Sequence, residues 1–72
     1  MPYEKIKQII CEEFEIDEDE ISLETNLAED LGFDELDFAD LCMSLEDAFH
    51  KEISDEDLEG IETIGDFVKH LE

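Results

Sequence analysis

The sequence predicts an all-α fold, a small bundle of three main helices and one short helix within a single domain of residues 1–72. Three observations support this prediction. Apolar residues recur at three- and four-residue steps, which is the spacing of an amphipathic helix. Residues that commonly cap helix N-termini stand in front of three helical segments. No segment shows the strict apolar and polar alternation of a half-buried strand, so an all-α class is favoured.

The first helix is expected from Tyr3 to about Phe14. Its apolar stripe has helical spacing and consists of Tyr3, Ile6, Ile9, Ile10 and Phe14. Four consecutive acids, Asp17 to Glu20, then break the pattern. We therefore expect the helix to end before them.

A long connection is expected to follow, up to Asp34. Turn signals within it are Thr25-Asn26 and Gly32. A connection of this length in a small domain usually carries a function or some local structure. Its apolar residues are expected to attach it to the core: Ile21, Leu23, Leu27 and Leu31.

The second helix is expected from Glu35 to about Phe49, with Asp34 as its N-cap. Acids in its first turn suit the helix dipole. One apolar face is expected to point inward and comprises Phe38, Leu41, Cys42, Leu45 and Phe49. A second apolar line lies on another side: Leu36, Ala39 and Met43. Either this helix is central in the bundle, or the second line is kept for a partner.

Two further helices are expected near the C-terminus. Ser54 is a candidate N-cap for a short helix that ends at Gly60. Thr63 is a candidate N-cap for the last helix, which continues to Leu71 with Asp66 at its third position.

The charge of the chain restricts its partners. It carries 25 acids and 4 bases, a net charge of −21. Nucleic acid and anionic membrane surfaces would be repelled, whereas basic proteins and metal cations would be attracted. Cys11 and Cys42 lie among apolar residues, which favours core positions in a reducing compartment. Together with the absence of a 20-residue apolar run, this predicts a cytoplasmic protein, and we expect a monomer.

One octapeptide is the most informative part of the sequence: Asp30-Leu31-Gly32-Phe33-Asp34-Glu35-Leu36-Asp37. It resembles the acyl carrier protein family, in which Asp-Leu-Gly-x-Asp-Ser-Leu-Asp opens the second helix. The likeness continues in Ile53 to Asp57, at the family's short third helix, and in Ile64-Gly65-Asp66, at the start of its fourth. The resemblance implies a four-helix acyl-carrier-type bundle that acts in fatty acid or polyketide synthesis and is not an enzyme.

The resemblance also implies a cofactor and partners. In the family, a transferase esterifies the serine with phosphopantetheine, whose thiol carries acyl groups. Glu35 occupies that serine position and has no hydroxyl, so we expect no phosphopantetheine on this chain. The residues expected to frame the site or contact basic surfaces of synthesis enzymes and the phosphopantetheinyl transferase are Asp34, Leu36, Asp37, Asp40, Met43, Glu46 and Asp47.

Other serines do not replace the missing one. Ser44 is nine residues beyond Glu35, on the opposite side of the helix. Ser22 is in the connection and Ser54 is a candidate cap. Either Glu35 was introduced into a true carrier, or the protein is a natural relative that docks without an arm. Phe38, one turn along, is bulky enough to fill space that other members open for an acyl chain.

A different class of function is suggested by the segment from Asp55 to Asp66. Its acids at positions one, three, five and twelve, and its glycine at six, follow the EF-hand calcium loop. Position twelve, however, is an aspartate where the loop needs glutamate. We therefore expect no metal site, and keep a divalent-cation-responsive module as the alternative. No catalytic constellation is present, and His50 and His70 are expected to be surface residues.

Overall fold

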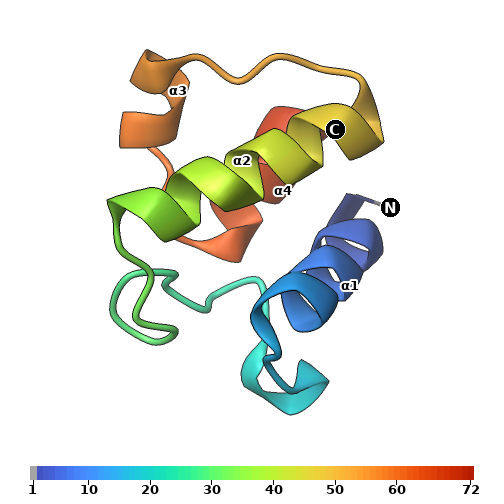
Figure 1. Ribbon diagram of the computed structural model, residues 1–72, viewed down its shortest axis with the longest axis vertical. Helices are drawn as coiled ribbons and strands as arrows, with labels where there is room; N and C mark the ends of the chain where they lie inside the picture. The colour runs from blue at the N-terminus through green and yellow to red at the C-terminus, as the bar shows by residue number, and fades with distance from the viewer. Residues whose placement is uncertain (1) are drawn as a thin grey trace.

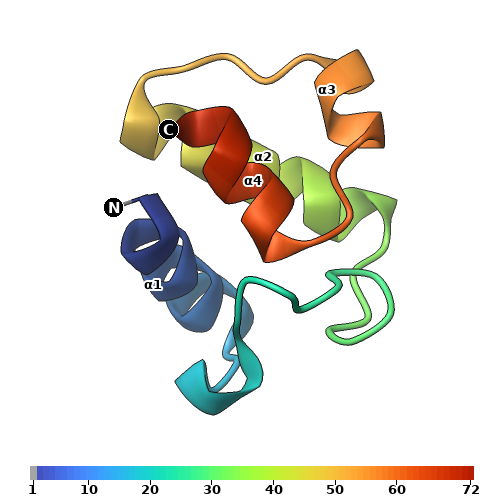
Figure 2. The same ribbon diagram turned by 180° about the vertical axis from the view of Figure 1, so that it is seen from behind.

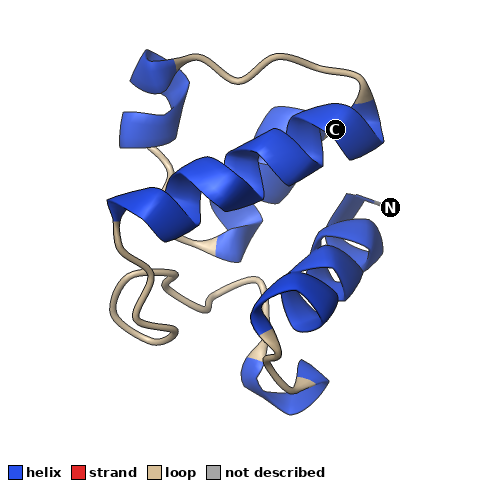
Figure 3. Ribbon diagram, viewed as in Figure 1, coloured by secondary structure: helices blue, strands red, loops and turns tan. Residues whose placement is uncertain are grey.

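The computed structural model describes residues 2–72 and contains four α-helices, as the sequence predicts (Figure 1, Figure 3). Their bounds are α1 Pro2–Phe14, α2 Glu35–Phe49, α3 Asp55–Glu59 and α4 Ile64–Leu71. The sequence did not predict the single 3₁₀ turn η1, Glu18–Glu20, which lies within the acidic run. Within the described residues, the extended pairing is limited to one isolated bridge between Asn26 and Thr63.

The three longer helices, α1, α2 and α4, pack around one core. In Figure 1, α2 crosses in front of α4, and in Figure 2 the same pair is seen from behind. α1 packs against both α2 and α4, so the first and last helices of the chain are neighbours. α3 lies apart from α1, beside the start of α2, at the end of a stretched connection. Within residues 2–72, no helix is both long enough and apolar enough to cross a membrane.

The core is made by the inward faces of the three main helices together with the long connection. The fully buried side chains are Ile6, Ile10, Leu27, Leu41, Leu45, Ile64 and Phe67. Leu41 and Leu45 belong to the predicted inward face of α2, on which Cys42 is also buried. The predicted core face of α2 is therefore confirmed.

The long connection contributes one aromatic side chain to the core that the sequence analysis did not expect, and one aliphatic side chain fewer than it expected. Phe33, which the sequence analysis did not place in the core, is buried, and its ring centroid lies 4.5 Å from that of Phe14 and 6.0 Å from that of Phe38. Ile21 and Leu27 are buried as predicted. The prediction for Leu23 is wrong, because 47% of this residue is exposed.

Side-chain caps fix where three helices begin. The Asp34 carboxylate accepts a hydrogen bond from the Asp37 N–H at 2.9 Å, and the Asp37 carboxylate accepts one from the Asp34 N–H at 3.2 Å. This is a reciprocal capping box at the start of α2. Thr63 and Asp66 form the same arrangement at α4, and Ser54 caps α3. All three predicted N-caps are therefore confirmed.

The long connection is joined by backbone hydrogen bonds to the segment before α4 and to the first turn of α4. The Leu27 N–H donates to the Glu62 carbonyl at 2.9 Å, and the Gly65 N–H donates to the Leu23 carbonyl at 2.8 Å. The approach at Gly65 is close enough that a Cβ atom there would lie 2.8 Å from the same carbonyl oxygen. These bonds hold the connection in place just before α2 begins.

The segment after α2 is also held by specific contacts. His50 ends the helix in the left-handed conformation, with φ of 55°. The Lys51 ammonium donates to the carbonyl oxygens of Leu71 and Glu72, at 3.1 and 3.2 Å. A cation at the last turn of a helix satisfies unpaired carbonyls and complements the dipole. Lys51 therefore ties the end of α2 to the end of α4.

Candidate functional site

Glu35 is the first residue of α2 and is exposed to solvent. Its neighbours Asp34 and Asp37 direct their carboxylates at the backbone of the capping box rather than outward. Glu35 thus presents its carboxylate at the N-terminal end of α2, where the backbone N–H groups and the helix dipole favour negative charge. The capping box fixes the backbone on both sides of this residue.

The outward face of α2 carries apolar residues beside acids. Leu36 is 75% exposed and Met43 is 67% exposed, so neither belongs to the core. Seven residues separate them, which is close to two helical turns and places them on one line. Asp40 and Asp47 are exposed and have the same seven-residue separation. Of the two alternatives for this second apolar line, packing inside the bundle is wrong.

Glu46 differs from the other acids of α2. It is partly buried, and its carboxylate accepts a hydrogen bond from the Ile53 N–H at 2.7 Å. This contact holds the connection between α2 and α3 against the helix. A structural contact therefore already occupies one oxygen of Glu46, whereas Asp40 and Asp47 remain on the surface.

A groove of about 860 Å³ opens beside Glu35, between the start of α2, the short helix α3 and the turn at residues 26–29. Its lining residues are Asn26, Ala28, Glu29, Glu35, Phe38, Asp55, Leu58, Glu59, Ile61 and Glu62. Phe38 is half-buried and meets Phe33 edge to face. It therefore belongs to both the core and the groove. Sequence periodicity carried no signal for this groove, because the groove depends on where α3 packs.

The hydroxyl groups of the chain do not offer an attachment point in this region. No serine or threonine lines the groove. The Ser44 hydroxyl donates to the Glu13 carboxylate on α1 at 2.7 Å, and the Ser22 hydroxyl lies 3.1 Å from that of Thr25. The Ser54 hydroxyl accepts the Asp57 N–H. A group that needs a serine ester at the start of α2 therefore does not fit the residues present.

The EF-hand alternative is wrong. Positions one to five of the supposed loop, Asp55–Glu59, form α3, so their acids cannot wrap around one ion. The supposed twelfth ligand, Asp66, accepts the backbone N–H groups of Glu62 and Thr63 at 3.0 and 3.1 Å. These two bonds lower the pKa of the Asp66 carboxyl below its ordinary value. Over residues 2–72, no cluster of three potential metal-ligating side chains is present.

The cysteines and histidines have structural surroundings. Cys42 is buried and Cys11 is half-buried, and desolvation raises the pKa of both thiols. His50 is exposed, as expected. His70 is less exposed than expected, because its imidazole Nε2 lies 3.4 Å from the Asp57 carboxylate and links α4 to α3.

Comparison with known proteins places these features in one family. Residues 4–71 match the family model described as a phosphopantetheine attachment site. The acyl carrier protein of Clostridium perfringens is 44% identical over 69 residues, covering 96% of this chain and 91% of that protein. A solved structure from Mycobacterium tuberculosis, assigned as an acyl carrier protein, superposes with a TM-score of 0.87 at 35% identity, covering 96% and 92% of the two chains. The acyl carrier protein of Enterococcus faecalis gives a TM-score of 0.81 at 37% identity, covering 97% and 89%.

Proposed function

This chain belongs to the acyl carrier protein family, and we propose that it is a member that docks on acyl-synthesis enzymes but cannot be loaded at residue 35. Proteins of this family are carriers and not enzymes, and their shared feature is the phosphopantetheine attachment site. They interact with synthesis enzymes and with the transferase that attaches the group.

The main support for this proposal is the chemistry of residue 35. The octapeptide that opens α2 matches the family motif at every fixed position except this one, where Glu35 stands exposed. Attachment through a serine ester needs a hydroxyl nucleophile, and a carboxylate neither forms that linkage nor attracts an anionic phosphate donor. The exposure of Glu35 and the lack of a hydroxyl among the groove residues support an unloaded chain.

The outward face of α2 supports a retained docking role. Leu36 and Met43 offer exposed apolar anchors, with Asp40 and Asp47 beside them. Acids around such anchors steer a basic partner toward the face, while the apolar contacts slow its release. We therefore propose that basic surfaces of synthesis enzymes and of the transferase contact this face.

The same behaviour follows from either origin of Glu35, as an introduced residue or as a natural loss of the arm. We further propose that residues 1–72 act as one acyl-carrier-like domain and as a monomer, since a net charge of −21 opposes self-association. Cys11 and Cys42 are free thiols, which fits a reducing, cytoplasmic environment.

Loading is tested by the intact mass of the protein after incubation with a phosphopantetheinyl transferase and coenzyme A. The unaltered chain is expected to show no added mass, and Glu35→Ser is expected to gain one phosphopantetheine. Ser44→Ala in the Glu35→Ser background is the control, and it should load equally well. Modification of the unaltered chain at any serine would refute the proposal.

A further inference from the structure

The turn that precedes α2 is closed by Asp30, the first acid of the octapeptide. Its carboxylate accepts a hydrogen bond from the Asn26 N–H at 2.8 Å, and its own N–H donates to the Asn26 carbonyl at 2.8 Å. The side-chain oxygen of Asn26 accepts a third hydrogen bond, from the Glu29 N–H at 2.9 Å. These three bonds hold residues 26–30 in one conformation, and the bond to the carboxylate is charge-assisted.

The turn is connected to the start of α2 through the backbone of Leu27. The Leu27 N–H donates to the Glu62 carbonyl at 2.9 Å, and the Leu27 carbonyl accepts the Phe33 N–H at 3.0 Å. Phe33 is buried and directly precedes Asp34, the N-cap of α2. This backbone closure therefore begins inside the turn and ends immediately before the α2 N-cap.

The same turn forms one wall of the groove beside residue 35. Asn26, Ala28 and Glu29 line this groove together with Glu35. A change in the turn would therefore move the wall of the groove as well as the backbone that leads into α2.

We propose that Asp30 is a positioning residue for residue 35, which fixes the start of α2 through the turn and leaves the Glu35 side chain as the obstacle to loading. Asp30 is exposed, so its charge would also attract a basic partner. Its carboxylate, however, binds the Asn26 backbone, whereas Asp40 and Asp47 lie on the outward face of α2. The inference rests on the proposed function, because it assigns the loss of loading to one side chain in a site that is otherwise kept in place.

Amide hydrogen exchange of the unaltered chain and its variants tests the hydrogen bond itself. Asp30→Ala is expected to speed exchange at the Asn26 and Phe33 N–H groups about threefold to tenfold, the equivalent of one hydrogen bond. Asp30→Asn removes the charge but keeps an acceptor oxygen, so exchange should stay within about twofold of that in the unaltered chain. The Gly65 N–H, which donates to the Leu23 carbonyl upstream of the turn, is the internal control and should be unchanged.

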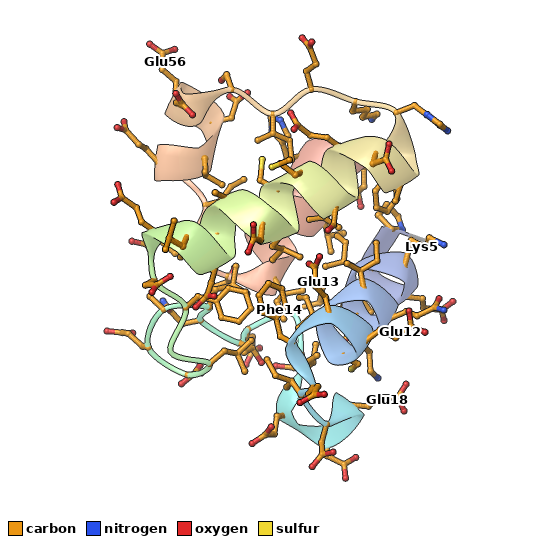
Figure 4. All side chains as sticks on the ribbon, in the orientation of Figure 1. Lys5, Glu12, Glu13, Phe14, Glu18 and Glu56 are labelled. Carbon is orange, nitrogen blue, oxygen red and sulfur yellow. The ribbon has the colours of Figure 1, made fainter. Side chains whose placement is uncertain are left out.

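Loading kinetics in the Glu35→Ser background test the role at residue 35. Asp30→Ala is expected to lower the kcat of the phosphopantetheinyl transferase about threefold to tenfold and to leave KM unchanged, because a misplaced reacting group slows the step after binding. Asp30→Asn should keep kcat. Loss of a docking charge would instead raise KM, and would do so equally in both variants. Glu56→Ala is the charge control and should change neither constant, because Glu56 extends into solvent away from the bundle (Figure 4).

Three results would overturn this proposal. One is an Asp30→Asn variant that loses as much protection and as much kcat as Asp30→Ala, which would show that the charge acts rather than the hydrogen bond. Another is an Asp30→Ala variant in which exchange and kcat are unchanged. The third is faster exchange at Gly65 by the same factor as at Asn26, which would show a general loss of stability.

A failure of the proposed function has a different signature. The unaltered chain would then gain mass with the transferase and coenzyme A, whatever the exchange rates at Asn26 and Phe33 are. Hydrogen exchange reads only the turn, and the comparison of Asp30→Asn with Asp30→Ala reads only what the carboxylate contributes.

Discussion

The exposed face of α2 leads to a prediction that separates docking residues from core residues. Met43 is 67% exposed, so about a third of it is buried, and full burial of a methionine side chain is worth about 1.5–3 kcal/mol. Met43→Ala should therefore cost at most about 0.5–1 kcal/mol. Leu41, two residues earlier, is fully buried, and Leu41→Ala should cost about 2–5 kcal/mol.

These values translate into a clear difference in thermal stability. In a domain of this size, 1 kcal/mol shifts Tm by about 4–8 °C. Met43→Ala should lower Tm by no more than about 8 °C, whereas Leu41→Ala should lower it by at least about 8 °C and remove a large share of the about 3–5 kcal/mol that a small core supplies. Circular dichroism melts at one fixed salt concentration measure both variants.

Binding kinetics then measure the docking role of the same face. With a phosphopantetheinyl transferase as the partner, Met43→Ala should raise the off-rate and leave the on-rate nearly unchanged. Asp40→Lys with Asp47→Lys should slow association and reduce its dependence on salt. Asp37 is unsuitable for charge reversal, because its carboxylate accepts the Asp34 N–H of the capping box.

A docking role for Met43 is refuted if Met43→Ala lowers Tm as much as Leu41→Ala, because Met43 would then pack inside the bundle. It also fails if the double charge reversal leaves both the on-rate and its salt dependence as they were. Leu36→Ala offers an independent check on the apolar line, since Leu36 is even more exposed than Met43.

Further predictions concern stability and reactivity. Because backbone N–H donors depress the folded-state pKa of Asp66, its carboxylate stabilises the fold above the unfolded value of about 3.9, and this contribution is lost as pH falls through the lower folded value. Asp66→Ala should thus cost about 1–2 kcal/mol in urea unfolding at pH 7 and progressively less below pH ~4; a cost independent of pH would contradict this. Gly65→Ala should lower Tm, because its Cβ would lie 2.8 Å from a backbone carbonyl oxygen, whereas Gly60→Ala, with a nearest atom at 3.7 Å, is the control and should not. The buried Cys42 should react with a thiol reagent more slowly than the half-buried Cys11 in the folded protein, and equally fast in urea.

Local signals explain what could be predicted from the sequence. The side chains of Asp34, Ser54 and Thr63 each accept the N–H of the residue three positions on, so a cap can be identified without knowing the tertiary fold. Helix ends and the inward face of α2 follow from similarly short-range patterns. The position of Glu35 at the start of α2 belongs to this predictable part.

Contacts between distant segments explain what could not be predicted. Leu23 is exposed, and its contact with the first turn of α4 is made by its backbone carbonyl, which accepts the Gly65 N–H. Phe33 is buried because Phe14 and Phe38 converge on it from two helices. The groove likewise requires residues 26–29, the start of α2 and α3 to meet in space. A periodicity of three to four residues carries none of this information.

The packing of α1 on α4 has a consequence for how the chain folds. Ile6 and Ile10 lie in the same core as Phe67, about 60 residues later. Bringing α1 and α4 together therefore closes a loop that spans nearly the whole sequence. The α1 stripe therefore has no complete cover until the last helix arrives, and α4 should dock late in folding. During translation, a nascent chain that lacks residues 64–71 would leave the apolar face of α1 open to solvent or to chaperones. Folding should consequently finish only after the C-terminal helix has left the ribosome.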